Sequence, residues 1–137
     1  MSTLKTTINI ASTDLFPTPV NFTFPVTETI GGAHSSFNTK VLPAAATNVV
    51  LFSSTAASGS TGILYFCIQA SADNLDTISV DIRRNTVPIT ADMMLFAPGD
   101  ISYFPVDASD AAGIIIRATN NASASIAALQ YFYGEKG

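Results

Sequence analysis

The sequence predicts an all-β fold, an antiparallel β-sandwich of jelly-roll-like topology with about eight to ten strands. Apolar and polar residues alternate with a period of two in several segments, and turn-forming residues recur about every 8–12 residues. No segment has the periodicity of a convincing amphipathic helix. Because 137 residues can bury one sizeable core, we predict a single sandwich domain over residues 1–137.

The N-terminal segment differs from the rest in composition. Residues 4–10 and 20–26 alternate as half-buried strands do, and Pro25 favours the end or an edge of the second strand. Residues 10–37 are richer in Pro, Thr and Gly than the remainder. We therefore expect residues 1–37 to form either an extended N-terminal arm or an excursion at the rim of the sandwich.

Short apolar runs predict the strands of the core. Runs rich in β-branched and aromatic residues are typical of strands buried on both faces or inside a sandwich. They are residues 49–52, 63–68, 114–116 and 126–133. Residues 77–83 alternate instead, with Ile78, Val80 and Ile82 on one side, and predict a half-buried strand.

Turn-forming residues separate these segments. They are Gly31-Gly32 and residues 58–60, 72–74, 97–100, 107–113 and 120–121. Pro98-Gly99 suits the two central positions of a type II turn, because the second of these needs a positive φ.

Charge is scarce in this chain. Charged residues make up 12% of the sequence, against about 25% in typical domains. The span from Val41 to Ala72 contains no charged residue and no histidine. Ser and Gly interrupt this span, so it does not form the roughly 18-residue apolar run of a membrane helix. The mean hydropathy is +0.36. Much of the surface is therefore expected to be hidden in a homo-oligomer, and we expect no membrane partner.

Nucleic-acid binding is not indicated. The net charge is −4, and the six basic residues are scattered except for the pair Arg83-Arg84. Neutralising phosphates requires clustered Lys and Arg.

The sequence does not contain the residue patterns that catalysis or metal binding requires. The single histidine, His34, has no Gly-x-Ser-x-Gly elbow and no nearby acid in sequence to orient it. One cysteine, Cys67, and one histidine are too few for zinc. We expect no enzymatic activity, no catalytic residues, no cofactor and no metal.

Calcium is the ion least easily excluded. Asp73, Asn74 and Asp76 form one oxygen-rich loop, and Asp107 and Asp110 form another. Neither has the full ligand spacing of a calcium loop, and Asp and Asn are common turn formers.

Aromatic residues supply the candidate interaction surface. Tyr131, Phe132 and Tyr133 alternate along a predicted C-terminal strand, so at least one ring points away from the core. A core on one face and a subunit interface on the other is favoured over a sugar-binding platform. The candidate interface residues are Leu4, Ile8, Phe16, Phe22, Phe24, Tyr131 and Tyr133.

The C-terminal part also carries a resemblance. Its segments are residues 93–107, 113–118 and 122–131, low-charge strands joined by Pro-Gly and Asn turns. Over roughly residues 49–133 this pattern of low-charge strands and turns resembles that of small accessory structural proteins of tailed-bacteriophage virions, particularly capsid decoration (cement) proteins.

The resemblance implies a virion structural protein assembled in the host cytoplasm. It further implies a trimer that clamps neighbouring subunits of the major capsid protein. It identifies no binding residues. The alternative is a tail-tip or fibre-type binding module that recognises a host glycan.

Overall fold

The protein is built of β-strands. The structure is a computed structural model that describes residues 2–13, 20–54, 62–84, 87–88, 94–107 and 113–136, and no helix occurs among them. The strands are β1 (Ser2–Ser12), β2 (Val20–Leu42), β3 (Val49–Ser54), β4 (Ile63–Ala70), β5 (Ile78–Arg84), β6 (Val87–Pro88), β7 (Met94–Phe96), β8 (Ile101–Asp107), β9 (Ile114–Asn120) and β10 (Ala127–Lys136). The predicted all-β fold is confirmed.

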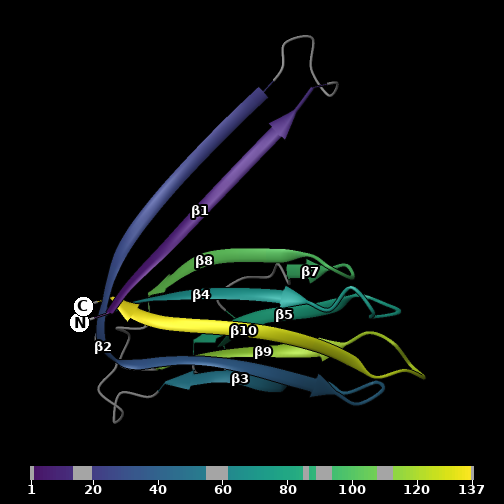
Figure 1. Cartoon of the computed structure of the whole chain (residues 1–137). Helices are drawn as coiled ribbons and strands as arrows, with labels where there is room; N and C mark the ends of the chain where they lie inside the picture. Colours follow the sequence, from purple (N-terminus) through teal and green to yellow (C-terminus); the bar gives the residue numbers. More distant parts are fainter. Residues whose placement is uncertain are drawn as a thin grey trace.

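The strands form two antiparallel sheets that stack as a sandwich (Figure 1). One sheet has the order β1-β2-β10-β4-β8, and the other has the order β3-β9-β5-β6, with β7 also paired to β5. From β2 onward the chain switches sheets at every connection except those from β5 to β6 and from β6 to β7. This interleaving is the pattern of a double-sheet jelly roll, in agreement with the predicted topology.

The period-two pattern explains which side chains are buried. In β9, Ile114, Ile116 and Ala118 are fully buried while Ile115 and Arg117 are half-buried. Successive side chains of a strand point to opposite faces of the sheet. Each strand therefore contributes one set of residues to the core between the sheets and another set to an outer face.

An aromatic cluster centred on Phe66 joins the two sheets. Its ring is fully buried and stacks on those of Phe104, Tyr131 and Tyr133, with centroids 5.6, 5.6 and 6.1 Å away. The ring of Tyr133 meets Phe52 of the opposite sheet edge-on at 4.9 Å. Such offset and edge-to-face contacts stabilise a core beyond the area that they bury.

Two buried asparagines fasten the loops at one end of the sandwich. The Asn120 amide group donates hydrogen bonds to the carbonyls of Pro43 and Ser125, both at 2.9 Å, and its oxygen accepts one from the Ala122 N–H. Asn74 donates to the carbonyl of Ala128 and accepts from the N–H of the same residue. Because buried polar groups need partners, these side chains hold four loops or strand ends in place.

The predicted turn at Pro98-Gly99 is present. Gly99 has a φ of 87°, and the Asp100 N–H donates to the Ala97 carbonyl at 3.0 Å. A positive φ at this position is the requirement of a type II turn, which glycine meets without strain.

A hairpin formed by β1 and the first part of β2 extends away from the sandwich (Figure 1). β2 is 23 residues long and changes partner near Ile30. Residues 20–30 pair with β1, residues 35–42 pair with β10, and Ile30 pairs with both strands. Among the described strands, β1 makes extensive contact with β2 alone. The hairpin is thus continuous with the sheet but is not packed on it.

We predict that Phe66→Ala destabilises the fold by about 3–5 kcal/mol, because it removes the ring at the centre of the cluster and leaves a cavity. The matched control is Phe37→Ala, since Phe37 lies in the same sheet with 66% of its surface exposed. Urea unfolding monitored by circular dichroism measures both changes. Equal losses of unfolding free energy in the two variants would contradict this account of the core.

Candidate functional site: a charge-poor sheet face

The outer face of the β2-β10-β4-β8 sheet is almost free of charge. We call this surface the neutral face and define it by the outward positions of the four strands. They are Phe37, Thr39 and Val41 of β2, Ala128, Gln130, Phe132 and Gly134 of β10, Ile63, Tyr65, Cys67 and Gln69 of β4, and Ile101, Tyr103, Pro105 and Asp107 of β8. Asp107, at one end, is the one charged residue in this set.

Register arranges these residues in rows across the sheet. One row runs Phe37, Phe132, Cys67, Tyr103. The next row runs Thr39, Gln130, Gln69, Ile101. Cross-strand neighbours in a row lie in side-chain contact range, so the face carries an aromatic band beside a band of amides and hydroxyl.

Large apolar side chains are exposed on this face. Phe37 is 66% exposed, Ile101 65%, Val41 56% and Ile63 41%. The rings of Tyr65 and Tyr103 stack in parallel with centroids 5.8 Å apart, and Tyr65 is 9% exposed. Contiguous exposed apolar surface marks interaction sites in soluble proteins.

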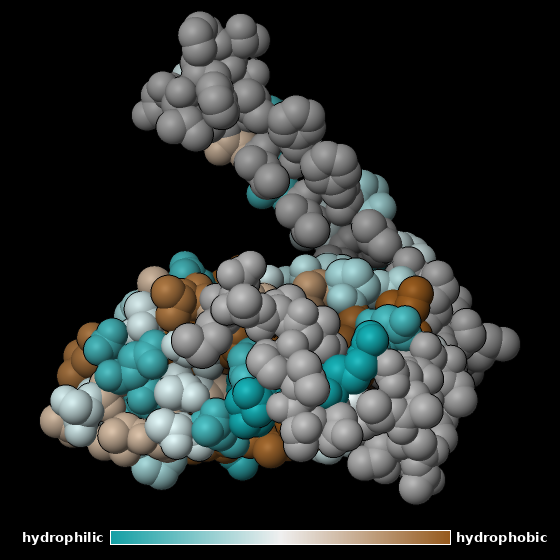
Figure 2. Space-filling view, turned by 180° about the vertical axis from the view of Figure 1, so that it is seen from behind, coloured by the Kyte–Doolittle hydropathy of each residue, from teal (hydrophilic) through white to brown (hydrophobic). Residues whose placement is uncertain are grey.

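The outer face of the other sheet is different in charge. Arg117 donates two hydrogen bonds to the carboxylate of Asp81, one of them from Nε at 3.0 Å, and Arg83 lies 3.3 Å from the same carboxylate. The hydrogen bond with Asp81 raises the pKa of Arg117. On the side seen in Figure 2, hydrophilic residues occupy much of the middle of the sandwich. The exposed Val50 of this sheet is paired with Arg117 and the exposed Leu95 with Ser79, so each of them has a polar cross-strand neighbour.

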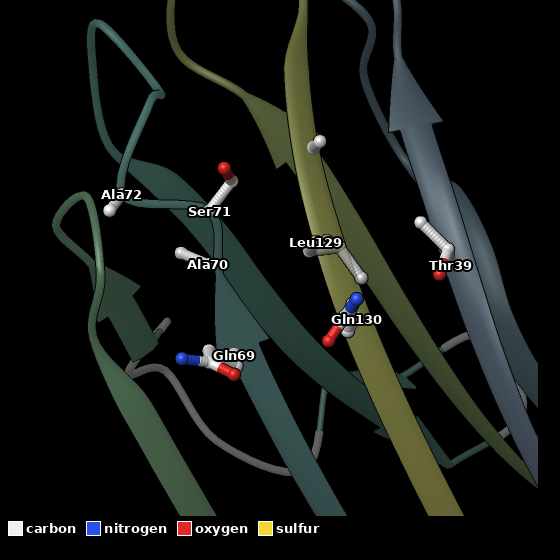
Figure 3. Close-up of a pocket in the computed structure, with 8 residues that line it drawn as sticks. Thr39, Gln69, Ala70, Ser71, Ala72, Leu129 and Gln130 are labelled. Atoms are coloured by element: carbon white, nitrogen blue, oxygen red, sulfur yellow. The ribbon is translucent and has the colours of Figure 1, made fainter.

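The amide band borders a hollow of about 280 Å³. Figure 3 shows Gln69 and Gln130 next to each other on β4 and β10, with Thr39 on β2 across from Gln130. Ser71 and the small side chains of Ala72 and Ala128 complete the wall. Among the described residues, the two glutamine amides have no hydrogen-bond partner, so their donors and acceptors are available to a ligand.

The two tyrosines of the sequence-based interface lie on the inner side of the sheet. Tyr131 is buried and Tyr133 is half-buried, and both belong to the cluster around Phe66. Burial, together with the neighbouring Tyr133, raises the pKa of Tyr131. The ring of this strand that faces outward is Phe132. The sequence indicates that Tyr131 and Tyr133 lie on one side of the strand and Phe132 on the other. Because both sides are apolar, it does not indicate which side faces the core.

The remaining candidate residues belong to the N-terminal segment. Leu4 and Ile8 lie in β1 and Phe22 and Phe24 lie in β2, where the register places Ile8 opposite Phe24. For these four residues the structure describes the backbone alone. Phe16 lies outside the described residues.

The residues considered for catalysis and metal binding form no common site where the structure describes their side chains. His34 lies in β2 with its side chain outside the described set, and Asp110 also lies outside it. Asn74 is committed to Ala128 through both ends of its amide, and Asp76 accepts a hydrogen bond from the Thr77 N–H, so both serve the loop itself. Among the described residues no three His, Cys, Asp or Glu side chains group around a common point.

A search of the described residues for a helix long and apolar enough to cross a membrane finds none. Comparison with protein-family models, with curated proteins and with solved structures gives no match to this chain.

Cys67 provides a chemical probe of the neutral face. Its half-buried thiol lies in the aromatic band, and burial raises its pKa. We predict that folded protein reacts with a maleimide more slowly than urea-unfolded protein at pH 7–8, because a raised pKa lowers the thiolate fraction. The folded rate should continue to rise above about pH 8.5, the ordinary thiol range. Mass spectrometry measures both rates, and identical pH profiles would show that the thiol is not shielded.

Proposed function

We propose that this chain is a non-enzymatic structural protein of a virion, specifically a capsid decoration (cement) protein that binds and stabilises the head. Its partners under this proposal are other copies of itself, in a trimer, and the major capsid protein. It works without a cofactor or metal and is assembled into the particle in the host cytoplasm.

The observation that carries the proposal is the neutral face. A surface with Phe37, Val41 and Ile101 exposed and without charges in its middle is unfavourable for a protein that remains free in solution. Permanent interfaces bury such surfaces, because depletion of charge and enrichment of aromatic residues characterise their centres. A particle that assembles once and stays assembled provides this burial.

The architecture supports the same class by fold-level analogy. Double-sheet jelly rolls are frequent in viral capsid proteins, although they also occur in lectins and cupins. The extended β1–β2 hairpin (Figure 1) adds a segment that can reach beyond the footprint of the sandwich. Immunogold electron microscopy of virions, with an antibody against this chain, tests the location. Regular labelling of heads is expected, and particles without label would overturn the proposal.

Self-association is expected to resist salt. Light scattering at micromolar concentration should give a mass that is a multiple of 14.3 kDa, and raising NaCl from 0.1 to 1 M should not dissociate the oligomer. The reason is that apolar contacts are not screened, whereas exposed charge pairs weaken as the Debye length falls from about 10 to about 3 Å. Dissociation into monomers at 1 M salt would mean that charge pairs hold the oligomer.

A second candidate function is a tail-tip or fibre-type module that binds a host glycan. The hollow bordered by Gln69, Gln130 and Thr39 favours it, because unpaired amides beside an aromatic band are groups that can recognise neutral sugars. Amides donate and accept hydrogen bonds, and the rings of Phe37 and Phe132 offer apolar surface one row away.

We predict under this second candidate that Gln69→Ala and Gln130→Ala each weaken binding to an array of immobilised neutral oligosaccharides at least tenfold. Thr119→Ala, on the outer face of the other sheet, is the matched control and should bind as the unmodified chain does. Absence of binding by the unmodified chain to any member of the array would remove the glycan candidate and leave the virion proposal standing.

A further inference from the structure

The second half of β2 is an edge strand of its sheet. β10 pairs with residues 35–42 along one side, and β1 pairs with residues 20–30 only. In the part of the chain that the structure describes, no strand pairs with the other side of residues 36–42, which lie beside β10 at the border of the sheet (Figure 1). We call residues 36–42 the β2 edge.

Hydrogen bonds near the end of β10 show which backbone groups of the β2 edge are directed outward. The Ala128 carbonyl accepts from the Ser71 N–H at 2.9 Å, and the Ala128 N–H donates to the Asn74 side chain at 2.8 Å, so both groups point toward β4. Successive residues of an antiparallel strand direct these groups to opposite sides. Leu129 therefore directs its groups to its partner Lys40. By the same alternation, the N–H and C=O groups that point away from β10 are those of Phe37, Thr39 and Val41.

The other edges of the two sheets carry features that hinder strand addition. β8 contains Pro105, β3 has an irregularity between Val50 and Phe52, and β6 and β7 are two and three residues long. Proline, bulges and short length are the usual protections of an edge. The β2 edge has no proline, and its register with β10 is regular. It is thus the most accessible template for another strand among the described edges.

Lys40 determines which strand fits this template. Alternation places it on the inner side of β2 with the fully buried Leu42, and Lys40 itself is half-buried. It forms no ion pair in the described part of the chain. An inward-pointing charge disfavours an apolar or basic strand at an edge, whereas opposite charges facing each other across two strands stabilise their pairing. The complementary strand therefore carries a carboxylate opposite Lys40.

A second copy of the β2 edge does not supply this carboxylate. An antiparallel contact centred on Thr39 would place Lys40 opposite Asn38 of the other copy. The two Lys40 side chains would then be diagonal neighbours, about 7–8 Å apart, with no acid between them. The charge at this position favours a different partner.

We propose that the β2 edge binds an extended segment of a partner protein as an added antiparallel strand, with a carboxylate opposite Lys40 and apolar side chains opposite Phe37 and Val41. The segment exchanges two hydrogen bonds with each of Phe37, Thr39 and Val41. The side chains of Phe37 and Val41 are 66% and 56% exposed, so apolar residues beside them gain cover. This inference goes beyond the proposed function, because it assigns a backbone-recognition site that neither the trimer nor the glycan candidate uses.

In this mode of recognition, main-chain hydrogen bonds supply affinity and alternate side chains supply specificity. Seven residues span only about 24 Å, so the contact is smaller than a standard interface and one isolated segment binds weakly. Amide chemical shifts in NMR spectra measure binding of this strength.

A synthetic heptapeptide added to the unmodified chain tests the inference. The probe is Thr-Val-Glu-Thr-Thr-Val-Thr with blocked ends, which in antiparallel register places its Glu opposite Lys40 and its two Val residues opposite Val41 and Phe37. We expect saturable shifts at millimolar peptide, largest for the amides of Phe37, Thr39 and Val41. Absence of saturable shifts at this edge would overturn the proposal.

N-methylated probes test whether the backbone is recognised. Methylating the nitrogen of the fourth peptide residue should weaken binding at least tenfold, because its N–H donates to the Thr39 carbonyl. Methylation at the fifth residue is the matched control, since that N–H points away from β2 and binding should persist. Equal losses from the two modifications would show that the peptide does not add as a strand.

A charge exchange tests the role of Lys40. Replacing the Glu of the probe by Lys should weaken binding to the unmodified chain at least fivefold, and Lys40→Glu should reverse this preference. Lys5→Glu, on the exposed side of the hairpin, makes the same change in net charge and is the control. Equal binding of the two peptides to the unmodified chain would contradict the assigned carboxylate, whether or not Lys40→Glu folds.

Hydrogen exchange identifies any other occupant of the edge. In the unmodified chain the amides of Phe37, Thr39 and Val41 should exchange faster than those of Asn38 and Lys40. Protection of all five in a monomer would show that the chain covers its own edge, and protection confined to the oligomer would show that a second copy does. Either result overturns the inference but leaves self-association and the labelling of heads to be decided by their own measurements.

Discussion

The packing of the Phe66 cluster between the sheets determines the rest of the molecule. Phe66, Tyr133 and Phe104 occupy one register row on the inner side of their sheet. Because alternate residues of a strand face opposite sides and a slip of one residue would reverse every side chain, burying this row forces Phe132 and Cys67 outward. The core and the neutral face are therefore two consequences of one register. A change that reorganised the inner row would also rearrange the outer one.

An apolar outer face is a liability for a protein in solution. Exposed apolar patches promote aggregation unless a specific partner covers them. The amide band limits this non-specificity, because Gln69 and Gln130 lose their hydrogen bonds to water when covered by a surface that does not satisfy them. A true partner of this face must therefore combine apolar groups with a few polar ones. A protein surface of mixed polarity meets this requirement, and so does a sugar.

Alternation and turn chemistry were sufficient to predict the sandwich, and the reasons are local. Ile78 and Val80 are buried as their spacing indicated, and Gly99 adopts the positive φ that its turn needs. What the sequence could not provide was the inward side of β10, since Tyr131, Phe132 and Tyr133 are all aromatic and a short apolar run has no distinguishable period. The change of partner along β2 was also hidden, because one alternating strand fits either neighbour. The neutral face could not be predicted either, because it depends on the strand register that places Phe37 beside Phe132.

The two candidate occupants of the neutral face exclude each other. The hollow beside Gln130 lies on the same surface as Phe37 and Phe132, so a protein partner lying over the aromatic band would also cover the amides. A glycan that bound there would have to displace that protein partner and would therefore favour the separated form, by the reciprocity of linked equilibria. If the face serves assembly, sugar binding must be weak in the oligomer. If it serves recognition, self-association must use another surface. One surface of this size has room for one of these roles at a time.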